Sequence, residues 1–352
     1  MNMHETLLER MKHGLLALRQ EDGSYRDGSL VDIRPTAEIV HGLLRLHIEE
    51  GVEQSLRWLL SKQHYNGSWG EEMHHATIRE NTLATAVIGE TLLAAHRRFH
   101  DKRYADAARK SFTFLLSQEM QPGSFAKIPE HKEDILNVDA ACASFFHAFY
   151  LIFKEQRAAD ARDRILRHLE KSQLEDGAYP YSVVEKDSPQ QIPLRDPYYH
   201  ALTLFFIMRT QQYPSLSVSI RRAFAWLDAQ LYRGRFRWDN SDVLFSLGST
   251  PAYAFSAACF HAAKLSSLPL TLSRLHVLQR RDGLFDPFEH VGSWQSLQGL
   301  YREITGQLPL AAKMQHIKER CKRIVKSRSS HPDLFYHSQI FYALSTLQGE
   351  LL

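Results

Sequence analysis

The sequence is poor in cysteine and carries little excess charge of either sign. Its 352 residues include only 3 cysteines, Cys142, Cys259 and Cys321, which lie far apart and fit neither a disulfide framework nor a zinc motif. We therefore expect a reducing, cytoplasmic compartment. The net charge of +3 comes from 43 basic and 40 acidic residues. This near balance disfavours nucleic-acid binding.

Long apolar runs and linkers are also scarce. Residues 1–20 are amphipathic and charged, without the apolar core of a secretory signal. The longest apolar stretch, residues 140–153, carries Ser144 and His147 and is too short to span a bilayer, so it predicts a buried helix. A peripheral contact with a membrane stays open. Since no Gly/Pro/Ser-rich linker interrupts the chain, we expect one domain over residues 1–352.

One local pattern is present six times: a glutamine, two to four residues, a glycine, any residue, and an aromatic. The six copies are Gln20/Gly23/Tyr25, Gln63/Gly67/Trp69, Gln118/Gly123/Phe125, Gln173/Gly177/Tyr179, Gln230/Gly234/Phe236 and Gln279/Gly283/Phe285. Each glutamine ends a run with helical periodicity, and the glycine permits the positive φ that terminates a helix. Near-regular spacing of about 50 residues is the signature of a repeat fold.

A second helix, apolar on nearly all sides, is expected after each aromatic. Alternation of amphipathic and buried helices describes an outer ring packed around an inner ring. The sequence therefore predicts an all-α toroid of the (α/α)6 type, with six or alternatively seven helix pairs. We expect inner helices to start near Pro35, Asn81, Val138, Pro197, Pro251 and Trp294, with a closing pair over about residues 309–347.

The repeats resemble those of a known superfamily. Gln63–Trp69 looks like the QW repeat of squalene-hopene and diterpene cyclases, and the segment around it is similar to the "NQxxDGSWG…NTLA" stretch of class II diterpene cyclases. The resemblance covers most of the chain and implies the toroid of terpenoid cyclases and protein prenyltransferases. It also implies protonation-initiated cyclisation of an isoprenoid, a prenyl diphosphate or a linear polyprene. Sugar-processing toroids use similar Gln…Asp-Gly-Ser turns.

Asp139 is the residue on which the cyclase hypothesis depends. The segment Asn137-Val138-Asp139-Ala140-Ala141 resembles the Asp-x-Asp-Asp motif of class II cyclases, with the middle aspartate retained. The resemblance implies Asp139 as the general acid, with Asn137 and Asp134 as its polar neighbours. In the alternative interpretation, Asn137 caps a helix and Asp139 is a first-turn carboxylate favoured by the helix dipole.

Inner helices of a toroid start on one rim, where their positive dipole ends suit a diphosphate or carboxylate. Polar and aromatic residues just before or within these first turns are therefore the expected substrate-binding set: Arg34, Trp69, Arg79, Arg195, Tyr198, Tyr199, Tyr253, Trp294, Tyr336 and His337. Further polar residues fall in the same positions: His74, His75, Glu80, Asn81, Asp196, His200, Asp239, Asp242, His290 and Gln339.

No metal or other cofactor is expected, apart from Mg²⁺ in the role of a counter-ion to a bound diphosphate. The chain has no two adjacent aspartates, so the magnesium-binding motif of class I synthases is absent. Residues 332–347 look like the "DFYHTCYCLSGL" region of prenyltransferase β subunits, where His337 matches a zinc ligand. The Asp-x-Cys pair that completes that zinc site is missing, because no aspartate precedes Cys259 or Cys321 by two residues.

Three functions remain as hypotheses from the sequence. The first is an isoprenoid cyclase with a deep, mostly apolar pocket for a small hydrophobic substrate. The second is a carbohydrate-active hydrolase or epimerase, which would use acids such as Asp134 and Asp196 and stack Trp69 and Trp294 on sugar rings. The third is a non-catalytic, ligand-binding toroid. The sequence does not specify the oligomeric state.

Overall fold

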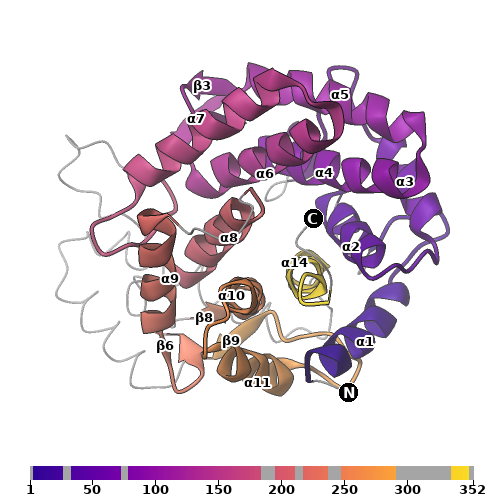
Figure 1. Ribbon diagram of the computed structural model, residues 1–352. Coiled ribbons are helices and arrows are strands. Elements are labelled where there is room, and N and C mark those ends of the chain that lie inside the picture. The colour runs from indigo at the N-terminus through magenta and orange to yellow at the C-terminus, as the bar shows by residue number, and fades with distance from the viewer. Residues whose placement is uncertain are drawn as a thin grey trace, which may run out of the picture.

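The computed structural model describes residues 3–26, 33–72, 78–183, 195–210, 217–236, 247–290 and 334–348. Twelve helices in these residues form two concentric rings (Figure 1). The outer ring contains α1 (Met3–Leu16), α3 (Val52–Ser61), α5 (Lys102–Ser117), α7 (Gln156–Ser172), α9 (Val218–Gln230) and α11 (Leu268–Leu278). The inner ring contains α2 (Ile33–Arg45), α4 (Thr82–Phe99), α6 (Leu136–Phe153), α8 (Pro197–Met208), α10 (Thr250–Ala262) and α14 (Leu334–Ser345).

Both rings close on themselves. Each inner helix packs against the next, and α14 contacts both α10 and α2, while the outer helices α1 and α11 contact each other. The expected (α/α)6 toroid is therefore confirmed, and the inner ring closes with six helices. The sixth is α14, which lies in the predicted closing pair. The helix start predicted at Trp294 lies outside the described residues.

The predicted starts of the other inner helices agree with the structure to within two residues. Asn81 is the N-cap of α4, where its side chain accepts a hydrogen bond from the Ala84 N–H at 2.9 Å. Pro197 occupies the first turn of α8, where its missing N–H costs nothing. One capping prediction was wrong: α6 starts at Leu136 after Ile135, so Asn137 lies inside the first turn and does not cap it.

Short antiparallel strands connect the helices on the rim where inner helices begin. The pairs among the described residues are β1 (Gly70–Glu72) with β2 (Ile78–Glu80), β3 (Glu119–Gln121) with β4 (Ser124–Ile128), β4 with β5 (His131–Asp134), β6 (Leu231–Tyr232) with β7 (Arg235–Phe236), and β8 (Leu247–Ser249) with β9 (Phe288–His290). Their period-2 signal is too short to read from sequence. They place side chains such as Glu71 beside the inner helices.

In the second, fourth and sixth repeats, the glutamine joins neighbouring outer helices. Gln279 Nε2 donates to the carbonyl oxygens of Gly283 and Leu7, both at 2.9 Å, and so ties the last turn to the first helix. Gln63 and Gln173 make the equivalent pair of bonds within their turns and to α5 and α9. At Gly283, with φ 84°, a Cβ would lie 2.1 Å from the Arg10 carbonyl oxygen, so only glycine fits.

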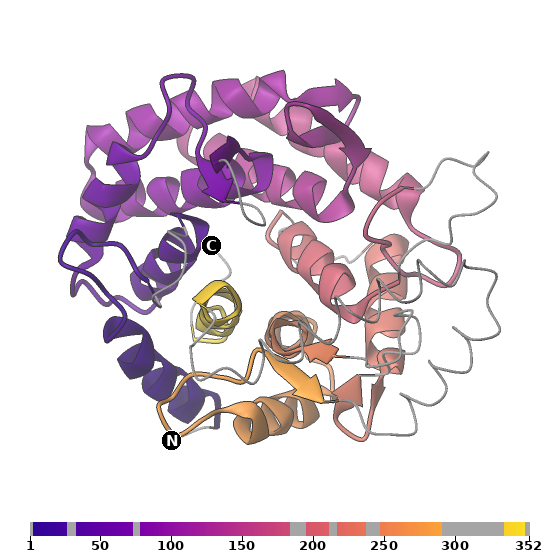
Figure 2. The same ribbon diagram turned by 180° about the vertical axis from the view of Figure 1, so that it is seen from behind.

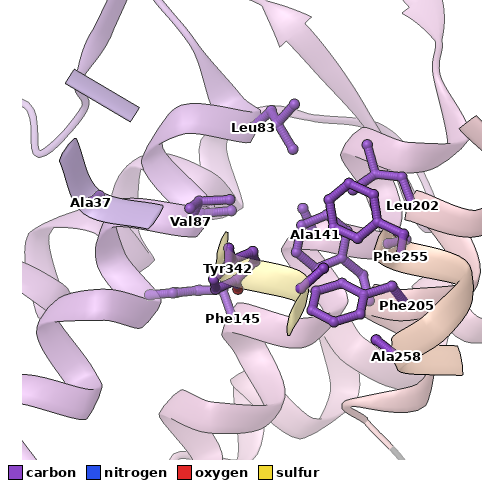
Figure 3. Close-up of a cluster of buried hydrophobic side chains, with 14 of the residues drawn as sticks. Ala37, Leu83, Val87, Ala141, Phe145, Leu202, Phe205, Phe255, Ala258 and Tyr342 are labelled. Atoms are coloured by element: carbon purple, nitrogen blue, oxygen red, sulfur yellow. The ribbon is translucent and has the colours of Figure 1, made fainter. Parts of the chain in front are cut away.

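Apolar side chains fill the middle of the inner ring. Figure 3 shows a buried cluster to which all six inner helices contribute: Ala37, Leu83, Val87, Ala141, Phe145, Leu202, Phe205, Phe255, Ala258 and Tyr342. Helix α6 has the length and apolar composition of a membrane span, but 72% of it is buried inside the fold. It contacts α4, α7 and α8, which explains its apolarity as that of a core helix.

Candidate functional site

A cluster of buried charges lies where the inner helices begin. Arg34 on α2 is its centre: Nη1 donates to Glu38 Oε1 at 2.9 Å, and Nε donates to Glu71 Oε1 at 2.8 Å. These three side chains are 5%, 3% and 10% exposed. The guanidinium also lies 4.5 Å from the centre of the Phe335 ring on α14. Figures 1 and 2 view the ring along its axis from its two sides, and both show α2 beside α14.

Neutral polar groups donate further hydrogen bonds to the two carboxylates. Asn81 Nδ2 donates to Glu71 Oε2 at 2.9 Å, and the Ser338 hydroxyl donates to Glu38 Oε2 at 2.5 Å. Across the ring, the Tyr198 hydroxyl on α8 donates to Gln339 Oε1 at 2.8 Å. We define the rim cluster as Arg34, Glu38, Glu71, Asn81, Tyr198, Ser338 and Gln339. It draws on four inner helices or their caps and on strand β1.

The rim cluster holds two carboxylates for one guanidinium. Burial lowers the pKa of Arg34, but Glu71 and Glu38 outweigh that effect, so its pKa is raised and it stays charged. Burial raises the pKa of Glu38, although Arg34 and the Ser338 hydroxyl act in the opposite direction. A proton is therefore most readily held on Glu38.

Other predicted rim residues lie near this cluster. Tyr198 and Tyr199 pack together with ring centres 4.9 Å apart. Asp196 accepts a hydrogen bond from the Tyr198 N–H at 2.7 Å as the N-cap of α8, and burial raises its pKa to about 6. Tyr336 packs against Phe335, and His337 is buried on the same turn of α14. The structure thus brings Arg34, Tyr198, Tyr199, Tyr336 and His337 to one rim.

The remaining predicted binding residues do not join the rim cluster. Trp69 is fully buried, and its indole N–H donates to the Leu59 carbonyl at 2.8 Å. Tyr253 is fully buried and donates its hydroxyl to Glu289. Arg79 is exposed on β2, and Arg195 lies 3.5 Å from Asp176. Five further residues lie outside the described part of the chain: Trp294, His74, His75, Asp239 and Asp242.

Asp139 has a role that recurs through the repeats. Its Oδ1 accepts the backbone N–H of Phe125, the aromatic of the third turn, at 2.7 Å. Asp139 is the fourth residue of its inner helix, and the fourth residue accepts the equivalent N–H in four other repeats. The pairs are Thr36 with Tyr25, Thr85 with Trp69, His200 with Tyr179, and Tyr253 with Phe236. Asp139 therefore anchors its turn.

Asp139 also meets two groups from outside α6. His168 Nε2 on α7 lies 3.1 Å from Asp134 Oδ1 and 3.7 Å from Asp139 Oδ2. Burial and the neighbouring Asp134 raise the pKa of Asp139 well above its usual value. Burial acts to raise the pKa of Asp134 too, but the hydrogen bond and charge of His168, together with hydrogen bonds from Ser124 and Asp139, outweigh it and the net shift is downward. Asp134 and Asp139 are thus brought together, whereas no hydrogen bond joins Asn137 to either of them among the described residues.

Glu38 and Glu71 were not among the site residues expected from the sequence. Glu38 lies on the second turn of α2, and Glu71 lies in a strand three residues long, so neither falls just before an inner helix. A usable signal was present, because Arg34 and Glu38 are charged residues four apart on a helix expected to be buried. The third partner, Glu71, becomes recognisable only in three dimensions.

Solved structures of carbohydrate-active proteins share this fold. A GH76 α-1,6-mannanase from Salegentibacter sp. matches with a TM-score of 0.67 at 12% identity over 99% of both chains. A glycosidase variant in complex with glucose matches with a TM-score of 0.68 at 11% identity, covering 99% of this chain and 98% of that one. The cellobiose 2-epimerase of Spirochaeta thermophila matches with a TM-score of 0.63 at 11% identity, covering 85% and 97%.

No family model matches the sequence, and no curated protein matches it. The mannanase has been solved in complex with α-1,6-mannotriose as an inactive variant in which two adjacent aspartates are replaced. This chain has no two adjacent aspartates, so that pair is not available to it. The structures named here support the toroid that the terpenoid resemblance implied, but not the terpenoid chemistry. The chain thus shares its (α/α)6 toroid fold with carbohydrate-active proteins.

Proposed function

We propose that this chain is a carbohydrate-active enzyme that binds a saccharide at the rim cluster and cleaves a glycosidic bond there. The observation that carries this proposal is the arrangement of Glu38 and Glu71, two buried carboxylates on one guanidinium. Glycoside hydrolysis needs one carboxyl group that holds a proton and one that is ionised. The fold shared with a mannanase, a glycosidase and an epimerase supports the same class of substrate.

The two carboxylates differ in surroundings in the sense that this chemistry requires. Glu38 has a raised pKa and acts as the general acid that protonates the glycosidic oxygen. Glu71 accepts hydrogen bonds from Arg34 and Asn81, and acts as the base or nucleophile on the anomeric carbon. Tyr198 and Tyr199 offer aromatic faces on which sugar rings stack. Arg34 positions both acids.

The test is a comparison of the wild type with Glu38→Gln and Glu71→Gln on oligosaccharides that include α-1,6-mannotriose, maltotriose and cellobiose. Products are separated by anion-exchange chromatography, and solvent deuterium uptake at C2 distinguishes epimerisation from hydrolysis. Each variant is expected to lower kcat by about 10²–10⁴-fold. On an aryl glycoside with a good leaving group, Glu38→Gln should retain more activity than Glu71→Gln, because such a leaving group needs no proton.

Glu53→Gln is the matched control, since Glu53 pairs with Arg57 on the exposed face of α3. Equal loss in this control would point to damage away from the rim. Turnover that survives in both rim variants would overturn the assignment. Saccharide binding without turnover in the wild type would leave the ligand-binding toroid as the function.

The isoprenoid hypothesis gives the acid role to Asp139, and one observation favours it: Asp139 is buried with a raised pKa beside Asp134. Its Oδ1, however, has the turn-anchoring role that Thr36 and Thr85 fill without any acid. We therefore rank the isoprenoid cyclase second to the carbohydrate-active enzyme. The test is to incubate the wild type and Asp139→Asn with linear isoprenoids and prenyl diphosphates. The extracted products are then identified by mass spectrometry. A cyclised product that disappears in the variant would replace our proposal.

A further inference from the structure

Three side chains at the junction of α6 and α7 place one ligand atom each within 4.8 Å of one another: Asp134, Asp139 and His168. His168 Nε2 lies 3.1 Å from Asp134 Oδ1 and 3.7 Å from Asp139 Oδ2. Two ligands of a tetrahedral zinc ion, each about 2.0–2.1 Å from the metal, lie roughly 3.3 Å apart. The two distances from His168 Nε2 are compatible with ligands around one ion.

The second oxygen of Asp139 has no role in the repeat. Anchoring the turn takes one acceptor, which is a single hydroxyl in Thr36, Thr85 and Tyr253. Asp139 Oδ1 meets that need, and Oδ2 is fully buried beside Asp134, which can pair with it only by sharing a proton; when both carboxyl groups are ionised, Oδ2 has no hydrogen-bond donor among the described residues. A buried carboxylate oxygen without a partner is costly. Its position beside His168 and Asp134 therefore indicates that it binds something else.

We propose that Asp134, Asp139 and His168 bind one divalent transition-metal ion of the zinc type. An imidazole ligand favours such an ion over Ca²⁺ or Mg²⁺, which prefer sites made of oxygen alone. Two carboxylates neutralise its charge, and water fills the fourth position. The side chains of Asp134 and His168 are 13% and 14% exposed, so the ion has a path from solvent.

The ion would tie one repeat to the next. Asp139 comes from the inner helix α6, and His168 comes from the outer helix α7 of the following repeat. In the second, fourth and sixth turns, glutamine bridges to the next outer helix. Gln118 instead donates to its neighbour Ser117 at 2.9 Å, and the third turn is joined to α7 by Arg164, which donates to the two carboxylate oxygens of Glu119 at 2.8 and 2.7 Å. The ion would add a second link beside this ion pair. The metal site is thus a structural tether, separate from the rim cluster.

The test uses the full chain, stripped with a chelator and dialysed against Zn²⁺. Elemental analysis should find about one equivalent of zinc, and thermal denaturation should show a higher Tm than in the stripped protein, because an ion that binds only the folded state stabilises it. Co²⁺ in place of Zn²⁺ should give the visible absorption of a four-coordinate site. His168→Gln and Asp139→Asn should each weaken Zn²⁺ binding by roughly tenfold or more. Asp139→Asn keeps a carbonyl acceptor for the Phe125 N–H and so preserves the anchor.

Asp160→Asn and His276→Gln are the controls. Asp160 is an exposed carboxylate on the same helix as His168, and His276 is an exposed histidine on α11. Both controls should bind zinc as the wild type does. The proposal fails if the stripped protein takes up no zinc, or if the controls lose as much affinity as the cluster variants. A proton shared between Asp134 and Asp139 would then account for the cluster.

Discussion

At the scale of single residues, the fourth residue of the inner helix accepts the backbone N–H of the repeat aromatic in five repeats, although the residue type differs. His200 shows this most clearly, because its Nδ1 accepts the Tyr179 N–H at 2.9 Å while Nε2 lies 3.0 Å from the Ala223 carbonyl oxygen. These bonds assign the neutral tautomer with the proton on Nε2. Protonation of Nδ1 would turn the acceptor into a donor that faces another N–H. The ring is therefore held neutral by its role in the turn.

This predicts a loss of stability in acid. Burial lowers the pKa of His200 to about 4, against the weaker opposing effects of the Ala223 carbonyl and Asp176. The usual value in an unfolded chain is about 6.5. Between these values the unfolded state binds more protons, so the stabilisation is complete above pH 6.5 and is lost as the pH falls toward 4. Linkage puts the loss at about 3 kcal/mol.

Urea unfolding at several pH values measures this loss, with His200→Thr as the comparison. The variant keeps an acceptor of the kind found at Thr85 but has no titrating ring. It should be less stable than the wild type at pH 7.5, and its stability should fall less steeply below pH 6.5. The slope that remains belongs partly to His147, whose pKa burial also lowers to about 4. Identical slopes in the two proteins would contradict the assignment.

At the scale of the helices, three of the repeat glutamines donate hydrogen bonds that connect one outer helix to the next. Gln279 is the one that closes the outer ring, since its amide reaches both its own turn and Leu7 on α1. Gln279→Leu would leave two carbonyl oxygens without this donor. We expect a loss of about 1–3 kcal/mol in the free energy of unfolding. Gln118→Leu is the control, because the Gln118 amide donates to the adjacent Ser117 hydroxyl on the exposed surface, and it should change stability by no more than about 0.5 kcal/mol.

The elements were predictable from the sequence because their signals are local. A glutamine, a glycine and an aromatic within eight residues specify one turn, and six such turns specify a toroid. The rim cluster was not predictable in the same way. Arg34 could be placed at the rim from its position before a helix, but Glu71 meets it through a three-residue strand 37 residues further along the chain. Asp139 was expected as a general acid from the resemblance, whereas the position that the structure gives it in the repeat is that of an anchor for the Phe125 N–H.

At the scale of the whole molecule, a second polar network connects inner helices that are not neighbours. Arg209, at the C-cap of α8, donates to Glu90 on α4 and to Tyr342 on α14. Glu90 also accepts from Ser144 on α6 at 3.1 Å, and Arg209 lies 3.4 Å from His41 on α2. Five inner helices thus meet through one ion pair. The side chains of Arg209 and Glu90 are almost fully buried, so the charge of each depends on the other.

That dependence can be measured with a double-mutant cycle on Arg209 and Glu90, whose side chains are 1% and 4% exposed. Arg209→Met leaves Glu90 buried without its counter-charge, and we expect it to lower the free energy of unfolding by about 3–5 kcal/mol. Glu90→Leu should cost a similar amount for the reciprocal reason. The double variant removes both charges and should recover most of the loss, since neither side chain then leaves the other unpaired. Simple additivity of the two single losses in urea unfolding would show instead that the two side chains act independently, and that the ring does not rely on this pair to hold its opposite sides together.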